Sequence, residues 1–362
     1  MKRKRFQSSF VEWALKQDIL QGQKIFLLDV GASGGIDSFW KQFEPNFRAV
    51  GFDPLVLEVE RLNRERLNEE IVYEAAWVGS DKATNFPTGT LYPFPFSTAS
   101  AAAEITKQNY LQVNFNSGQE IIYSERRISL DKLLNIYNIF EIDALKIDTD
   151  GFDYFVLDGS ENLLKNGQVL LVECECQMHE IAPGWPGFAE IDQLMRSAGY
   201  RLVDIDPWHY TRVALPGRFM YDIHAQTEDG QALFVDALYM LDPSIDASAR
   251  DRLTENPIKL VKHALLLYAF GYSDLAADTL LLIKNLEYNG NFVIQDALDR
   301  MVPENPYEIH SYSKYTALFN RDPDCFLSSR WKSAQEKAGR SKNSKRQRGL
   351  IEFLQAIVKR QK

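Results

Sequence analysis

An acidic residue beside a glycine-rich turn is the first feature of this sequence that could do chemistry. Asp29 lies near the end of an apolar run, 25–30, and three glycines follow within residues 31–35. Because glycine accepts positive φ and has no Cβ, such a turn can lie directly against a ligand. A second apolar run ends in Asp53, where a carboxylate can accept hydrogen bonds from a ribose diol. These residues predict a pocket for a nucleoside.

The turn does not match the loops that cradle phosphates. A dinucleotide fingerprint would need glycine where Ser33 and Ile36 stand, and a P-loop would need Gly-Lys-Ser or Gly-Lys-Thr. A nucleoside pocket without a phosphate cradle suits S-adenosylmethionine, which has an adenosine and an amino acid but no phosphate. Two alternatives stay open: the glycine turn could serve packing alone, and Asp53 before Pro54 could simply cap a helix.

A second group of acids follows a strand in the middle of the chain. The run 144–147 delivers Asp148 to the same carboxyl edge as the glycine turn, and Asp150 comes two residues later. An EF-hand is excluded, because it would require acids where Lys146 and Leu157 stand. Carboxylates at this edge are candidates for removing a proton from a reacting group.

The next apolar run, 169–176, carries acids on one face. Its alternation puts Glu173 and Glu175 on one side and two cysteines on the other. We expect these cysteines to be buried free thiols, since the chain has three cysteines and no complete pairing. His179 follows in the next loop.

A parallel sheet is needed to hold these residues together. The alternation of apolar runs and helical spacing over residues 25–78 predicts the right-handed βαβαβ half of a doubly wound α/β fold, whose ligands bind at the carboxyl ends of the strands. A short helix is expected to follow the glycine turn. The further predicted elements are strands at 25–30, 47–52, 71–78, 144–148, 169–176, 200–205 and 233–241, the last of them antiparallel, and helices at 55–68, 129–139 and 191–198.

Two stretches interrupt this rhythm. Residues 80–127 combine short β-prone pieces with prolines, which predicts a β-hairpin insertion and a loop over the pocket. Residues 206–231 lack periodicity and include Trp208 and Tyr210. We expect a loop there, suited to a sugar or an anionic acceptor, with simple aromatic packing as the alternative. After Pro243 the pattern is helical.

The composition favours a folded, cytoplasmic protein with one large domain and an appendage. The 362 residues are 45% hydrophobic with a net charge of −9. No apolar run reaches the roughly 18 residues that cross a bilayer, and the basic N-terminus lacks the apolar segment of a signal peptide. Residues 331–362 carry ten Lys or Arg and two Glu, which leaves −17 on the rest and argues against a nucleic-acid enzyme. We expect this basic tail to be solvated, with peripheral membrane contact as the alternative.

Taken together, these motifs resemble the FkbM-type methyltransferases of the class I S-adenosylmethionine-dependent group. The most specific motif is Lys-Ile-Asp-Thr-Asp-Gly at 146–151, and the other matching stretches are 29–35, 51–54, 157–159 and 171–173. The resemblance implies a seven-stranded, mostly parallel, Rossmann-like sheet. We expect three regions: an N-terminal lead-in helix at 1–21, the methyltransferase domain at 22–242, and a helical C-terminal region with a basic tail at 243–362.

The resemblance also implies a cofactor and its contacts. The residues that it implies for binding S-adenosylmethionine are Asp29, Gly31, Ala32, Ser33, Gly34, Gly35, Asp53, Ala76 and Asp148. It implies O-methylation of a hydroxyl on a sugar, a glycan or a secondary metabolite. The family usually has Glu or Gln where Asp150 stands, so the reach of this acid is one methylene shorter.

Methyl transfer to a hydroxyl also requires removal of a proton from the acceptor. We predict Asp148, Asp150 or His179 as the general base, with Glu173 shaping the acceptor side. The same oxygen-rich set, together with Asp153, could hold Mg²⁺, which we do not favour, so no metal site is assigned.

Two other classes of function stay open. A nicotinamide-dependent oxidoreductase would use the same scaffold, but the missing dinucleotide fingerprint argues against it. A non-catalytic scaffold on a methyltransferase fold would bind a partner through the C-terminal helices. The sequence does not distinguish a glycan acceptor from a small molecule.

Overall fold

The computed structural model of the chain divides into two compact units, Met1–Tyr288 and Asn289–Lys362. The predicted insertion at 80–127 lies largely outside the described residues. The limits predicted at residues 21 and 242 stay predictions, and the first compact unit includes both. The described residues are 8–81, 122–137, 139, 141–166, 169–178, 184–211, 215, 217–220, 226–286 and 293–337.

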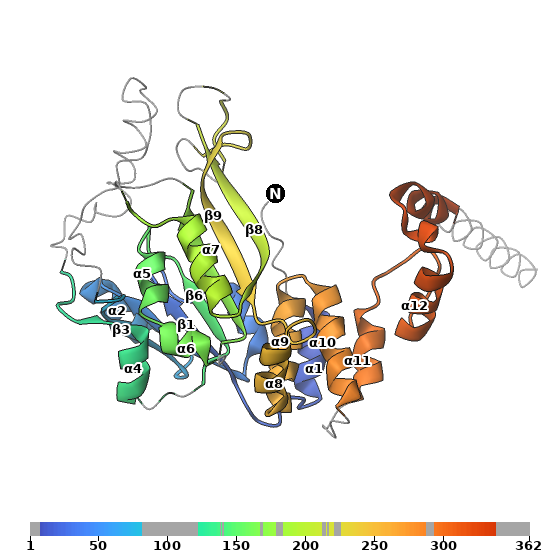
Figure 1. Ribbon diagram of the computed structural model, residues 1–362, viewed down its shortest axis with the longest axis horizontal. Helices are drawn as coiled ribbons and strands as arrows, with labels where there is room; N and C mark the ends of the chain where they lie inside the picture. Colours follow the sequence, from blue (N-terminus) through green and yellow to red (C-terminus); the bar gives the residue numbers. More distant parts are fainter. Residues whose placement is uncertain are drawn as a thin grey trace, which may run out of the picture. The chain divides into compact units, whose positions relative to one another are not determined.

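Seven strands of the first unit form a single sheet (Figure 1). They are β1 (Ile25–Val30), β2 (Phe47–Asp53), β3 (Ile71–Ala75), β6 (Ala144–Ile147), β7 (Leu171–Gln177), β8 (Arg201–Tyr210) and β9 (Gln231–Met240). The order is β3-β2-β1-β6-β7-β9-β8. Neighbours from β3 to β7 run parallel, and β9 is antiparallel to both β7 and β8. The predicted seven-stranded, mostly parallel α/β sheet, with its antiparallel last strand, is confirmed.

Strand β1 lies at the centre of this order, between β2 and β6. All six of its residues are buried, as expected of a strand that is covered on both faces. In a doubly wound sheet, the crevice for ligands opens where the strand order reverses, at the carboxyl ends of the strands. The end of β1, where the glycine turn begins, is that point.

Helices cover both faces of the sheet (Figure 1). Helix α7 covers the face of the sheet that carries Cys174 and Cys176 of β7. Tyr239 of β9 lies on the same face, and its hydroxyl donates to Asp192 of α7 at 3.4 Å. The two cysteines are buried and free, with their sulfurs 3.5 Å apart, as predicted. Among the described residues of this unit, the helices are α1 (Ser9–Lys16), η1 (Ser38–Phe43), α2 (Val56–Glu65), α4 (Leu130–Tyr137), α5 (Asp153–Asp158), α6 (Glu161–Lys165), α7 (Phe188–Ser197), α8 (Ala247–Thr254), α9 (Pro257–Ala269) and α10 (Ser273–Asn285).

Two predicted elements near the site differ in detail. The short helix after the glycine turn is the 3-10 helix η1, which begins after Asp37, whose side chain accepts from the Phe39 N–H at 2.8 Å. The predicted third strand, 71–78, is divided: β3 ends at Ala75, and the Ala76 N–H makes the last hydrogen bond to β2, to the carbonyl oxygen of Asp53. The following residues, Trp77–Val78 (β4), instead pair in parallel with Arg127–Ile128 (β5).

The loop predicted from residue 206 onward is wrong in its first part. Strand β8 continues to Tyr210, so Trp208 and His209 lie on a strand. The pairing of β8 with β9 extends to Tyr210 opposite Gln231. This pairing supplies hydrogen-bond partners for the backbone N–H and C=O groups, so the strand forms although its side chains do not alternate. The antiparallel hairpin of β8 and β9, at the end of the strand order, therefore carries Trp208 and Tyr210.

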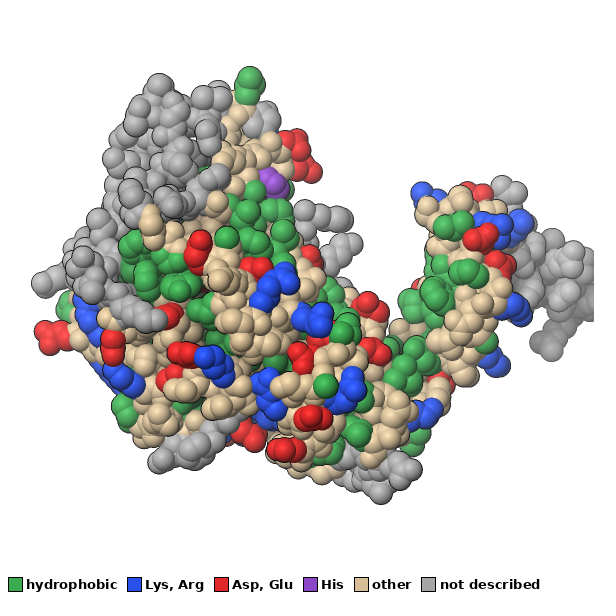
Figure 2. Space-filling model, in the orientation of Figure 1, with side chains coloured by type: hydrophobic (Ala, Val, Ile, Leu, Met, Phe, Trp, Pro, Cys, Tyr) green, Lys and Arg blue, Asp and Glu red, His purple; other side chains and the backbone are tan. Residues whose placement is uncertain are grey.

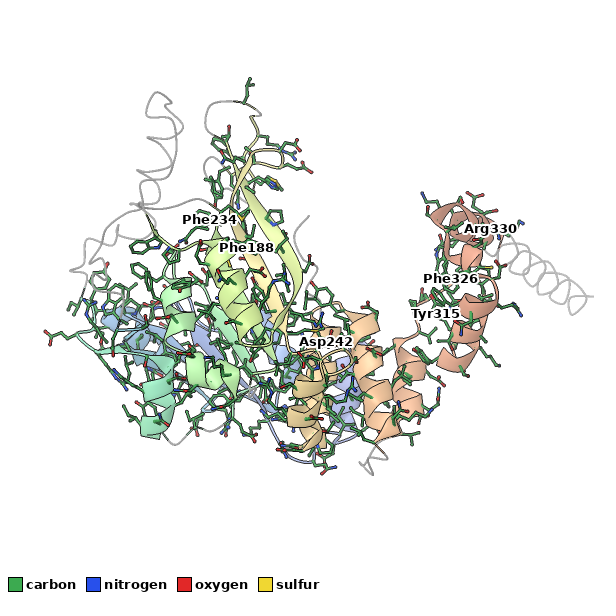
Figure 3. The ribbon with its side chains drawn as sticks, in the orientation of Figure 1. Phe188, Phe234, Asp242, Tyr315, Phe326 and Arg330 are labelled. Atoms are coloured by element: carbon green, nitrogen blue, oxygen red, sulfur yellow. The ribbon has the colours of Figure 1, made fainter. Side chains whose placement is uncertain are left out.

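The described part of the second unit, residues 293–337, is helical. It contains α11 (Ile294–Met301), α12 (Tyr312–Arg321) and η2 (Pro323–Phe326). Figure 3 labels Tyr315 and Phe326, whose rings pack edge to face with centroids 5.2 Å apart. Phe319 and Trp331 complete this aromatic cluster. In the part of the chain that the structure describes, no helix is long and apolar enough to span a bilayer.

A buried ion cluster attaches α9 to the start of β6. The Asp143 carboxylate accepts hydrogen bonds from the ammonium groups of Lys259 and Lys262, each at 2.9 Å, and from the Phe26 N–H at 2.9 Å. All three charged side chains are buried. Removing one member of such a cluster leaves the others charged and unpaired in the interior.

The next residue of α9, His263, is fully buried, and neither of its ring nitrogens has a hydrogen-bond partner among the described residues. Burial lowers the pKa of His263 to about 4. The ring is therefore neutral in the folded protein at pH values where the unfolded chain would protonate it.

We predict that Asp143→Asn lowers the free energy of unfolding by about 3–5 kcal/mol, because two buried ammonium groups lose their shared buried carboxylate and Lys259 keeps only the more distant Glu141, at 3.6 Å. The measurement is urea denaturation followed by circular dichroism. As a control, Glu12→Gln removes an exposed ion pair with Lys16 and should leave the denaturation midpoint unchanged. Equal midpoints for Asp143→Asn and wild type would contradict the role of the cluster.

His263→Leu is expected to change how stability depends on pH. Relative to this variant, wild type should be fully stable above pH 6.5 and lose on the order of 3 kcal/mol as the pH falls towards 4, since the unfolded imidazole binds a proton first. The free energy of unfolding of both proteins is measured between pH 4 and 8, and the value for His263→Leu is subtracted from that for wild type. The subtraction is needed because buried carboxyls with a raised pKa stabilise both proteins as the pH falls. A pH-independent difference would refute the assignment.

Candidate functional site

The glycine turn after β1 packs so closely against the chain after β6 that residue 31 has to be glycine. Gly31 has φ +88°, and a Cβ there would lie 1.8 Å from the backbone oxygen of Asp148. The N–H groups of Gly31 and Ala32 donate to the carbonyl oxygen of Phe52 at 2.8 and 3.0 Å. At Gly34, with φ +83°, no atom of the described chain lies within 4 Å of the Cβ position. The turn therefore packs closely against the chain after β6 at Gly31, whereas the described chain leaves space beside Gly34.

The outer side of the turn is held by α2 and β3. The Gly34 N–H donates to the Glu58 carboxylate at 3.0 Å, and the Ile36 N–H donates to the Tyr73 hydroxyl at 3.0 Å. A Cβ on Gly35 would lie 3.2 Å from the same hydroxyl. These contacts fix the shape of the turn within the chain itself.

Asp53 is buried at the end of β2, next to the turn. One carboxylate oxygen accepts from the Leu55 N–H at 2.8 Å, so the capping alternative is part of its role. The carboxylate also accepts a backbone hydrogen bond from Ser33, and the carbonyl oxygen of Asp53 accepts from the Ala76 N–H at 3.1 Å. Burial raises the pKa of Asp53 to about 6 despite these hydrogen bonds. The structure thus brings Asp53, Ser33 and Ala76 together.

The aromatic ring of Tyr123 lies near this carboxylate. Tyr123 stacks on Trp77 with ring centroids 5.5 Å apart and pairs with Leu55 in an isolated β-bridge. Burial raises the pKa of Tyr123, and the negative charge of Asp53 raises it further. A flat aromatic surface beside a buried carboxylate can pack against the base of a nucleoside.

Three charged side chains form a row across the centre of the sheet. Asp29, Lys146 and Glu173 are register partners on β1, β6 and β7, so they share one face. The Lys146 ammonium lies 3.4 Å from the Asp29 carboxylate and 3.3 Å from that of Asp148. Burial raises the pKa of Asp29 to about 6, although Lys146 lowers it. Burial alone would lower the pKa of Lys146, but the three carboxylates outweigh it and raise that pKa.

The segment after β6 turns sharply and presents two acids at the edge of the sheet. Asp148 is half exposed, and Asp150 is exposed with a left-handed φ of +52°. Asp153 is fully buried at the start of α5, where it accepts from the Thr149 hydroxyl at 2.9 Å and the Gly151 N–H at 3.3 Å. Burial, and then the charge of Asp148, raise the pKa of Asp153 to about 7. Asp153 therefore braces the turn that exposes its two neighbours.

A second acidic row continues along the edge towards the hairpin. Glu175, Asp236 and Asp206 are register partners on β7, β9 and β8. The Trp208 indole N–H donates to Asp236 at 2.9 Å. Burial raises the pKa of Glu175 well above its ordinary value, and nearby carboxylates, Asp148 first among them, raise it further. This side of the edge is rich in carboxyl groups, of which Glu175 is held in its neutral form.

Most of the site residues predicted from the sequence meet at the carboxyl ends of β1, β2 and β6. Glu173 lies in the row beneath this edge, and His179 lies outside the described residues. Sequence reasoning missed Lys146, Tyr123 and Asp236. For Lys146 a signal was available, since it is the charged residue of an apolar strand. The residues brought together are Asp29, Gly31, Ala32, Ser33, Gly34, Gly35, Asp53, Ala76, Asp148 and Asp150.

Within the described ranges, no three or more His, Cys, Asp or Glu side chains are grouped to hold a metal ion. The acids are engaged in other ways: Asp29 and Asp148 pair with Lys146, and Asp153 binds the turn before α5. Mg²⁺ thus has no preassembled ligand set among these described side chains.

Comparison with solved structures finds methyltransferases at low similarity. One is a precorrin-6y C5,15-methyltransferase from Geobacter metallireducens GS-15, with 10% identity over 66% of this chain and 92% of that chain and a TM-score of 0.31. Another is the N-methyltransferase NodS from Bradyrhizobium japonicum WM9 in complex with S-adenosyl-L-homocysteine, with 11% identity, 65% and 88% coverage and a TM-score of 0.29. No curated protein matches the chain.

The family comparison covers the site itself. The model of the methyltransferase FkbM domain matches residues 29–202, a range that begins at Asp29 and includes the glycine turn, Asp53 and the acids of β6 and β7. The lysine and the carboxylates of the central row all fall within it. Residues 29–202 are therefore a methyltransferase domain of the FkbM family.

Proposed function

We propose that this domain transfers a methyl group from S-adenosylmethionine to a hydroxyl of a sugar, a glycan or a secondary metabolite. The observation that carries the proposal is the meeting of the glycine turn with the buried carboxylates of Asp29 and Asp53 at the switch point of the sheet. A carboxylate suits the hydroxyls of a ribose and the ammonium of an amino acid. The turn at 31–35 has no basic side chain for a phosphate, in agreement with a phosphate-free cofactor.

The residues around the turn fit the parts of this cofactor. Asp53 would hold the ribose diol, Asp29 would accept from the ammonium group, and Tyr123 with Trp77 would flank the base. Close approach of a ligand is possible at Gly34, where the described chain leaves space. When bound, the cofactor supplies a methyl group on positively charged sulfur, so the protein has mainly to position the acceptor.

The acceptor hydroxyl has to lose its proton when it receives the methyl group. Asp148 and Asp150 are the carboxylates that this edge exposes, and Lys146 engages Asp148. We therefore assign proton removal to Asp150, with Glu173 lying in the buried row beneath. Asp148 and His179 are the alternatives.

The charge of the edge favours an uncharged or basic acceptor. The exposed acids Asp148 and Asp150 would repel phosphate groups. The row of Glu175, Asp236 and Asp206 offers hydrogen-bonding groups, and Trp208 offers an aromatic face to a sugar ring. On the face that Figure 2 shows, the described Lys and Arg side chains are mixed with Asp and Glu instead of forming a basic groove. These features support a glycan or a metabolite over a nucleic acid.

Asp53→Ala should weaken the binding of S-adenosylmethionine and S-adenosylhomocysteine by about 10- to 100-fold, the equivalent of a lost charged hydrogen bond. Isothermal titration calorimetry measures both ligands. Asp53→Asn keeps an oxygen for the Leu55 N–H and separates the loss of charge from the loss of the cap. Asp81→Ala, an exposed acid paired with Lys132, is the matched control. An absence of binding by wild type would overturn the proposed cofactor.

Asp150→Asn should reduce kcat by about 10²- to 10⁴-fold, the range for loss of a general base, while the Kd for S-adenosylmethionine stays unchanged. Formation of S-adenosylhomocysteine is followed with panels of sugar and metabolite acceptors. Glu161→Gln, on the exposed surface of α6, provides the control. An unaltered kcat would exclude Asp150 and transfer the role to Asp148 or His179.

A further inference from the structure

Lys146 is a largely buried cation at the centre of the proposed cofactor pocket. Its side chain is 18% exposed, and its ammonium lies between the carboxylates of Asp29, at 3.4 Å, and Asp148, at 3.3 Å. The Glu173 carboxylate follows in the same row. A long flexible side chain loses conformational entropy when it is held in this way, so the contacts on both sides have to compensate.

The two acids that Lys146 joins belong to the two strands that form the pocket. Asp29 is on β1, directly before the glycine turn, and Asp148 follows β6. The backbone oxygen of Asp148 is also the atom that excludes a Cβ at Gly31. Lys146 therefore links the side chains at the same place where the two backbones meet.

We propose that Lys146 is a positioning residue of the cofactor pocket, which holds the carboxylates of Asp29 and Asp148 together and keeps Asp29 ionised to accept a hydrogen bond from the cofactor's ammonium group. This inference rests on the proposed function. Lys146 itself touches neither the transferred methyl group nor the acceptor. It acts through the charge and the position of Asp29.

The surroundings of Asp29 explain why it needs a cation. The charged and titratable groups that face it are Lys146, Asp148 and Glu173 from β6 and β7, and Tyr73 from β3. Burial and two neighbouring carboxylates favour the protonated acid, and Lys146 opposes them; together they leave the pKa of Asp29 at about 6. Without Lys146, the remaining groups all raise that pKa further. A protonated Asp29 would lose its attraction for an ammonium group.

The test is the pH dependence of binding of S-adenosylhomocysteine, measured by calorimetry between pH 5.5 and 8 on the full chain. Wild type should lose affinity as the pH falls through about 6, which gives the binding curve an acid limb, because Asp29 and Asp53 both take up a proton there. Lys146→Met, which keeps the length of the side chain without its charge, should move this acid limb upward by about one pH unit or more and weaken binding at pH 7 by roughly tenfold. Lys146→Arg should restore the wild-type limb.

The variant Asp29→Asn tests whether the loss of affinity at low pH arises from the Asp29 carboxylate. This variant should bind more weakly than wild type and with a shallower acid limb, because only Asp53, whose pKa is also about 6, still takes up a proton in this range. A purely structural role of Lys146 would weaken binding equally at every pH, so an unmoved limb in Lys146→Met overturns the proposal. If Lys146→Met fails to fold, an acid limb in Asp29→Asn that is as steep as that of wild type overturns it instead. Failure of wild type to bind at any pH would overturn the proposed function as well, and is distinguishable from both results.

Discussion

Burying carboxylates beside one another is unfavourable, and this constraint organises the centre of the molecule. Asp29, Asp53 and Asp153 are all buried, and burial raises the pKa of each above its ordinary value. The chain offsets that cost in three ways. Lys146 stands beside Asp29, backbone N–H groups donate to Asp53, and a hydroxyl and an N–H donate to Asp153. The pocket at the carboxyl ends of β1, β2 and β6 is the result.

The same edge changes character along the sheet. Over β1 and β2 it combines the glycine turn, single acids and the stacked rings of Tyr123 and Trp77, which suits a nucleoside. Over β7, β9 and β8 it becomes a row of acids with Trp208 beside it. Under the proposed function, the cofactor would bind at the first part of this edge and the acceptor at the second, with the exposed Asp148 and Asp150 between them.

The helices after β9 belong partly to the body of the fold. Asp143, at the start of β6, is bonded to two lysines of α9, so the lower end of the central strand is fixed by residues more than a hundred positions later. Figure 3 labels Asp242 where the chain leaves β9; its carboxylate accepts from the N–H groups of Ser244 and Ile245 and shapes the turn into α8. The site at the upper end of β6 therefore rests on a strand that is anchored at its base.

The sequence by itself determined the class of fold, and it predicted the strand ends at which most of the candidate acids meet. Local signals were sufficient for these: an apolar strand running into glycines, alternation along residues 169–176, and acids directly after strands. It could not reveal that the Asp148 backbone forbids a Cβ at Gly31, that Lys146 lies between two acids, or that Asp236 continues the acidic row. Each of these depends on the register between strands that are distant in the chain, and that register is decided by packing in three dimensions. The extension of β8 through Trp208 has the same cause, because pairing with β9 overrides a side-chain pattern that by itself predicts a loop.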